Sequence, residues 1–168
     1  MTMGDKAKHG SRGLGEDEFV QRVEACCYPN NQFHHADHIR LAWIYVRRHG
    51  TQEAEERIAR AIRQFAISLG HEKKYHETLS RAWVRLVAVA QALTPKVVSF
   101  DDFLAKHGWL LDRGALSAFY SGACLGTDAA RSGWVEPDKH PLPCVAGDCV
   151  DGWAKKSEPH DLTMELTP

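Results

Sequence analysis

The sequence predicts an all-α protein, a single-domain helical bundle of about five to seven helices with an irregular C-terminal tail. The 168 residues fit one domain. Apolar residues recur at helical spacing along most of the chain, and strand-like alternation is absent from the sequence. We expect a disordered N-terminus over 1–14, a helical domain over 15–135 and the irregular tail over 136–168.

The first three helices are delimited by their breakers. A helix is predicted in "GEDEFVQRVEACCY", which starts with acidic residues and repeats apolar residues at helical spacing. The breaker "PNNQ" follows, and a second helix is predicted from about Ala36 to Arg48, where Gly50 stops it. Thr51 is expected to cap a third helix that ends at Gly70.

The later elements become shorter toward the C-terminus. A fourth helix is predicted in "YHETLSRAWVRLVAVAQAL", and the following "TP" ends it. Ser99 is expected to cap a short helix that has acidic residues in its first turn. Two shorter pieces, "GALSAFYS" and "DAARSGW", come next, before proline, glycine and charged residues dominate from Glu136 onward.

Three histidines lie close together in "FHHADHIRLAW", at the start of the second helix. Each helical residue advances about 100° around the axis. On that projection His35 and His38 fall on the apolar side of the helix, which is centred near Ala42, and His34 falls at the boundary with solvent. The opposite, solvent-facing side is predicted to hold Asp37, Arg40, Arg47 and Arg48.

The fourth helix supplies a third inward imidazole. His76 shares the rim of its apolar face with Trp83. Arg81 and Arg85 are predicted on the outer face, and Glu77 projects about 100° away from His76 toward the polar side.

Two inward histidines one turn apart and a third on another helix suit a metal site of three nitrogen ligands. We therefore predict a divalent transition metal, iron or zinc, bound by His35, His38 and His76. Three protein ligands would leave an open position for chemistry, and His34, Glu55 or water could supply a fourth ligand. Tyr75, as a proton donor, and Glu77 are the candidate catalytic residues.

Two functional classes follow from this reading. The first is a metal-dependent enzyme with a mononuclear ion, acting on a small-molecule substrate as an oxygenase, hydrolase or lyase. Its pocket is expected to be lined by Tyr45, Phe65 and Trp83. The alternative is a non-catalytic helical binding or accessory protein whose histidines are structural, because buried histidines are commonly just hydrogen-bonded.

Composition argues against several other classes. Hydrophobic residues make up 43% of the chain, charged residues 26%, and the net charge is −1. The charges alternate in sign and form no basic stripe, so no nucleic-acid partner is expected. No apolar run approaches the roughly 18 residues of a membrane span, and the N-terminus does not read as a secretory signal. These features predict a cytoplasmic protein.

Five cysteines are present, at positions 26, 27, 124, 144 and 149. An odd number in a cytoplasmic chain predicts free thiols, and adjacent Cys26 and Cys27 do not readily pair with each other. The spacing of Cys144 and Cys149 makes a loop disulfide between them geometrically possible. The same spacing is a poor fit to half of a zinc site.

Several stretches resemble an uncharacterised family of small bacterial helical proteins. The shared patterns are Phe-x-His-x-x-His followed by a hydrophobic residue and Arg, here Phe33, His35, His38 and Arg40, and the block Tyr-His-Glu-Thr at 75–78. The resemblance covers roughly residues 18–143. It implies no particular activity, and it favours His35 over His34 as the inward residue.

Overall fold

The structure, a computed structural model, describes residues 13–145, and this part of the chain is all-helical with no strand. The predicted fold class is therefore confirmed. The α-helices are α1 (Glu16–Glu24), α2 (His35–His49), α3 (Thr51–Ser68), α4 (Glu77–Leu93), α5 (Phe100–Lys106), α6 (Gly122–Leu125) and α7 (Asp128–Ser132). Short 3-10 helices connect them: η1 (Asn30–Gln32), η2 (Glu72–Lys74), η3 (Gly108–Leu111) and η4 (Ala115–Ala118).

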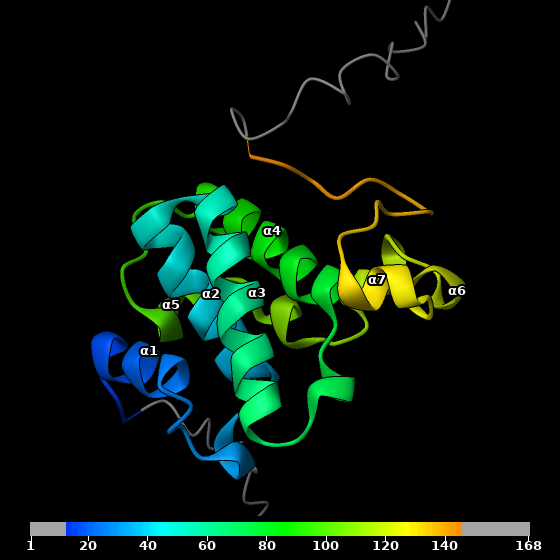
Figure 1. Cartoon of the computed structure of the whole chain (residues 1–168). Helices are drawn as coiled ribbons and strands as arrows, with labels where there is room; N and C mark the ends of the chain where they lie inside the picture. The colour runs from blue at the N-terminus through cyan, green and yellow to red at the C-terminus, as the bar shows by residue number, and fades with distance from the viewer. Residues whose placement is uncertain (1–12, 146–168) are drawn as a thin grey trace, which may run out of the picture.

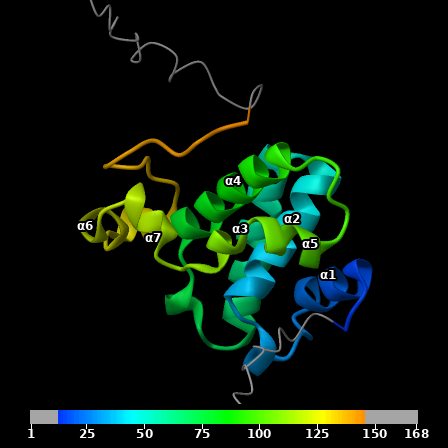
Figure 2. The ribbon, with the colours of Figure 1, turned by 180° about the vertical axis from the view of Figure 1, so that it is seen from behind.

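Helices α2, α3 and α4 pack against one another at the centre of the molecule (Figure 1). Helix α1 packs beside α3, and α6 and α7 lie near the beginning of α4, at the other side of the bundle (Figure 2). One continuous apolar core joins these elements, and its largest fully buried side chains include Trp43, Tyr45, Phe19, Tyr120 and Phe103. No helix within residues 13–145 combines the length and apolar character needed to cross a membrane.

Helix α2 is buried on two sides, which corrects the solvent face predicted for it. Asp37 is 0% exposed and Arg40 is 8% exposed. Arg40 Nη2 donates to the backbone oxygen of Leu14 at 2.7 Å, and its guanidinium lies over the Phe19 ring, 4.9 Å from the centroid. The chain before and within α1 therefore covers a face that the projection assigned to water. Arg47 lies on the exposed remainder of the helix, as predicted.

The helix ends follow local backbone chemistry. Gly50, at φ 78°, is the C-cap of α2 and the N-cap of α3, a left-handed conformation that glycine adopts without steric cost. Thr51 is the first residue of α3, so the prediction that it caps this helix was wrong. Ser99 caps α5 as predicted, since its side chain accepts from the backbone N–H of Asp102.

The segment after α7 has no regular structure and contacts the loop between η4 and α6. The backbone N–H of Lys139 donates to the carbonyl of Phe119 at 3.0 Å, and the Asp138 side chain accepts from the N–H of Ser121 at 2.7 Å. The predicted irregular tail is confirmed as far as residue 145. Disorder was expected over residues 1–14. Leu14 packs against the core and accepts from Arg40, whereas positions 1–12 lie outside the described residues, as do 146–168.

Candidate functional site

His35 begins α2, and its ring connects this helix to η3. Its Nε2 lies 2.9 Å from the backbone oxygen of Leu110. Because a carbonyl only accepts, Nε2 carries the proton. The ring also packs edge-on against Trp83 of α4, with centroids 4.6 Å apart. Burial lowers the pKa of His35, so the neutral imidazole is favoured. His35 therefore joins three elements of the fold through one side chain.

His38 lies one turn further along α2 and also faces inward. It is half-buried, its ring packs edge-on against Phe33 at a centroid distance of 4.5 Å, and it hydrogen-bonds the backbone of His34. Burial, followed by the charges of His35 and Arg113, lowers the pKa of His38 to about 4. The predicted inward orientation of His35 and His38 is confirmed, and His34 is exposed as predicted.

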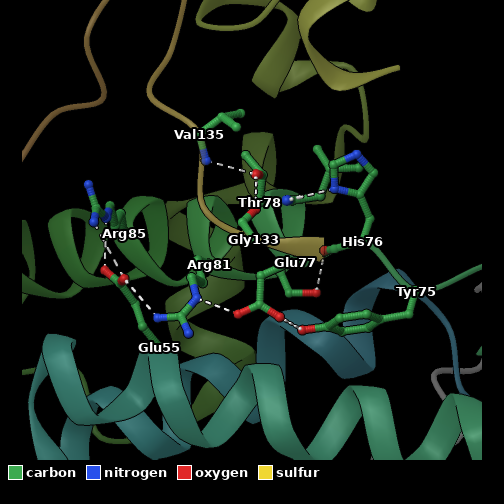
Figure 3. Close-up of polar contacts among 11 residues, drawn as sticks. Glu55, Tyr75, His76, Glu77, Thr78, Arg81, Arg85, Gly133 and Val135 are labelled. Carbon is green, nitrogen blue, oxygen red and sulfur yellow. Dashed lines mark hydrogen bonds and ion pairs between the residues drawn. The ribbon is translucent and has the colours of Figure 1, made fainter. Parts of the chain in front are cut away.

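His76 is the N-cap of α4, and both of its ring nitrogens bind the backbone. Nδ1 accepts from the N–H of Leu79 at 3.3 Å, and Nε2 lies 2.9 Å from the carbonyl of Leu125 in α6. The first contact satisfies one of the donors left free at a helix start, and the second requires Nε2 to be protonated. Figure 3 shows the His76 ring at the start of α4, with a dashed line from the ring to the backbone of the helix. The helix thus starts at Glu77 rather than at Tyr75.

The three predicted metal ligands contact different parts of the chain. His35 and His38 are neighbours on α2, whereas the ring of His76 faces α6. Within the described residues, no group of three or more His, Cys, Asp or Glu side chains is arranged to hold a metal ion. Glu55, a predicted fourth ligand, is instead bound by arginines. The metal site of His35, His38 and His76 stays a prediction.

Buried carboxylates and arginines link α3 to α4 (Figure 3). Arg85 Nε donates to Glu55 Oε1 at 2.8 Å, and Arg81 Nη1 lies 3.9 Å from Glu55 Oε2. Arg81 Nε also donates to Glu77 Oε1 at 2.7 Å. Two carboxylates therefore balance two guanidinium groups. The Glu55 and Glu77 side chains are 12% exposed and the arginines are more exposed, so this network is intermediate between surface and core.

Tyr75 and Glu77, the predicted catalytic residues, do lie together. The Tyr75 hydroxyl donates to Glu77 Oε2, and both residues are buried. Glu77 lies on the same side of α4 as Arg81, but this side is not open to water at Glu77, because Arg81 and Tyr75 bind its carboxylate. Burial and the hydrogen bond to Glu77 raise the pKa of Tyr75 well above its ordinary value. Such a phenol holds its proton tightly, which makes it a poor general acid near neutral pH.

Thr78 fixes the chain after α7 onto α4, a role that nothing in the sequence pattern indicated. Its side chain is fully buried. The hydroxyl donates to the carbonyl of Gly133 at 2.7 Å and accepts from the N–H of Val135 at 3.1 Å (Figure 3). One hydroxyl therefore satisfies two backbone groups of a segment more than 50 residues away.

The shape of the surface offers a small hollow at the α2–α5 junction. It encloses about 130 Å³ and is lined by Arg40, Ser99, Phe100 and Asp101. This volume is smaller than the roughly 300–1,000 Å³ of pockets that bind drug-sized ligands. Tyr45 and Phe65, predicted to line a pocket, lie in the core, where the Tyr45 hydroxyl donates to Glu24 at 2.6 Å.

The cysteines differ in state. Cys26, Cys27 and Cys124 are free, as predicted. Cys144 is disulfide-bonded, so the prediction of free thiols was wrong there. The sequence spacing made Cys149 a possible partner of Cys144, and Cys149 lies outside the described residues.

Part of the charge network between α3 and α4 could have been predicted from sequence spacing. Glu77 and Arg81 are four residues apart, an arrangement that brings opposite charges together on a helix. The link from Arg85 to Glu55 spans 30 residues and has no such signal.

Comparisons of the chain with protein-family models, curated proteins and solved structures gave no match.

Proposed function

We propose that this chain is a non-catalytic helical binding or accessory protein whose inward histidines are structural. The observation that supports this proposal is the hydrogen bonding of His76: both ring nitrogens bind backbone atoms, one in α4 and one in α6. A nitrogen that donates to a carbonyl, or accepts from an N–H, has no lone pair left for a metal. His35 and His38 each bind one backbone group.

The hydrogen bonds of His35 and His76 place these two imidazoles at junctions between segments, whereas His38 binds the start of its own helix. His35 joins α2 to η3, and His76 joins α4 to α6. Both junctions connect the three central helices to the C-terminal third of the domain. In this proposal His35 and His76 hold the C-terminal third of the domain against the bundle. This structural role requires no metal and no substrate.

The metal-dependent enzyme is the second proposal, and one feature of α2 favours it. His35 and His38 are one turn apart, and burial favours their neutral forms, which are the forms that bind zinc or iron. That proposal includes a small-molecule substrate and roles for Tyr75 and Glu77. It requires His76 to exchange a backbone bond for the ion.

Three coarser attributes accompany either proposal. A cytoplasmic location is supported by the free thiols of Cys26, Cys27 and Cys124, and opposed by the disulfide at Cys144. The absence of a nucleic-acid partner is supported by the net charge of −1. Membership of the bacterial family with the Phe-x-His-x-x-His motif rests on that motif and the Tyr-His-Glu-Thr block.

Metal analysis and unfolding of wild type and variants separate the two proposals. Tag-free wild type is compared with His76→Ala and His76→Asn for metal content, for zinc and iron(II) binding by titration, and for unfolding in urea. Structural histidines predict metal-free wild type that does not bind either ion. His76→Ala should lose about 1–3 kcal/mol, from the lost cap and the unpaired carbonyl of Leu125.

His76→Asn is the matched control, because asparagine is a good N-cap but cannot reach as far as Leu125. It should recover part of the stability that His76→Ala loses. The result that would overturn the proposal is close to one transition metal per wild-type chain, lost both in His76→Asn and in a His35→Ala, His38→Ala double variant. That outcome would establish the metal site.

A further inference from the structure

The C-terminal end of α1 has a backbone conformation that is unusual for a cysteine. Cys26 has φ 57°, and it is the one residue other than glycine with a positive φ in the described part of the chain. The N–H of Cys26 donates to the carbonyl of Val23 at 3.0 Å, and the N–H of Cys27 donates to that of Arg22 at 2.8 Å. This is the Schellman pattern, in which glycine usually occupies the left-handed position. A cysteine there bears a steric cost that glycine would avoid.

The two adjacent thiols both lie over this helix end. The Cys27 thiol donates to the carbonyl of Ala25 at 3.3 Å, and the Cys26 thiol is 4.0 Å from the carbonyl of Glu24. These carbonyls are consecutive in the chain. Cys27 is exposed and Cys26 is half-buried, and both are free, so reagents in solution reach the pair.

We propose that Cys26 and Cys27 form a two-thiol binding site for a thiophilic trivalent centre of the arsenical class. Sulfur ligands suit soft acceptors, and two sulfurs on one short segment bind them as a chelate. In the reaction with an arsenic(III) oxide, the arsenic–oxygen bonds break and two arsenic–sulfur bonds form. The oxygen leaves as water with both thiol protons, so no oxidant or reductant takes part. This site is independent of the histidine function proposed above.

Phenylarsine oxide is loaded onto the full chain without added reductant, so the disulfide of Cys144 is in place during uptake. Wild type should take up one equivalent by intact mass. Chelation should make displacement by excess 2-mercaptoethanol slower by on the order of a hundredfold than for a single thiol. The dithiol 2,3-dimercaptopropanol should release the adduct promptly.

Single variants decide which thiols bind. Cys27→Ser and Cys26→Ser should each abolish the adduct that resists 2-mercaptoethanol, while circular dichroism confirms that they fold. Cys124→Ser and a Cys144→Ser, Cys149→Ser double variant should keep it. The proposal is overturned if the wild-type adduct is displaced as readily as that of Cys27→Ser, or if the resistant adduct survives in Cys27→Ser.

Discussion

His38 occupies surroundings in which an imidazolium ion is unfavourable. It is half-buried against Phe33, and it lies near His35 and the cationic Arg113. Its pKa falls from 6.5 to about 4 for these reasons, burial first. Between these values the unfolded chain binds a proton at this residue and the folded chain does not. Folding stability from His38 is therefore complete above pH 6.5 and decreases as the pH falls toward 4.

Acidification from pH 7 to pH 4.5 should thus cost wild type about 1–3 kcal/mol more than a His38→Gln variant, which has no proton to gain at this position. Urea unfolding at both pH values measures the two differences. Because other groups titrate in both proteins, only the difference between them reports on His38. Equal losses in the two proteins would show that the His38 ring is as well solvated in the fold as in the unfolded chain.

Thr78 should matter through its hydroxyl rather than its shape. Thr78→Val keeps the volume but leaves the carbonyl of Gly133 and the N–H of Val135 without their partner in a buried site. We expect a loss of about 2–4 kcal/mol in the free energy of unfolding, measured in urea. Thr78→Ser, which retains the hydroxyl, should cost clearly less. The reverse order would mean that methyl packing dominates here.

Helices α3 and α4 are joined by the ion pairs of Glu55. Its side chain is 12% exposed, against 26% for Arg81 and 34% for Arg85, so the pairs are intermediate between surface and core. Glu55→Gln should destabilise the fold by about 1–2 kcal/mol, between the values for exposed pairs and for a broken buried pair. The loss should shrink in 1 M salt, which screens partly exposed charges.

Glu53→Gln is the matched control for that experiment. Glu53 lies on the same helix and pairs with Arg57 at 2.7 Å, but both side chains are largely open to water. Its effect on urea unfolding should be much smaller than that of Glu55→Gln. Equal effects would indicate that the Arg81 and Arg85 contacts with Glu55 add nothing to an ordinary surface pair.

The described domain should unfold as one unit. A single apolar core includes residues of α1 through α5 and continues into η3 and η4. Trp43 is buried in the centre of this core, and Trp134 packs on Arg85 at its edge, with the guanidinium 4.0 Å from the ring centroid. Tryptophan fluorescence and far-UV circular dichroism should therefore give coincident urea transitions. A separate early transition by fluorescence would show that part of the domain unfolds before the rest.

Local chemistry alone determined the helices and several of their ends. Apolar spacing predicts α1 to α4, glycines end α2 and α3, and Ser99 caps α5. The projection of α2 also separated inward His35 and His38 from exposed His34. These features depend on residues within a few turns of one another, so they can be predicted from the sequence pattern.

Only the tertiary structure decided which helix faces are covered and what the inward polar groups bind. Arg40 is buried because the chain near Leu14, 26 residues away, lies over α2. His35 binds a carbonyl 75 residues away, and the ring nitrogens of His76 are taken up by α4 and by α6, 49 residues on. A helical projection orders side chains around one axis, but it does not show how many neighbours surround that axis. Whether an inward imidazole meets a metal or a carbonyl is set by those distant neighbours.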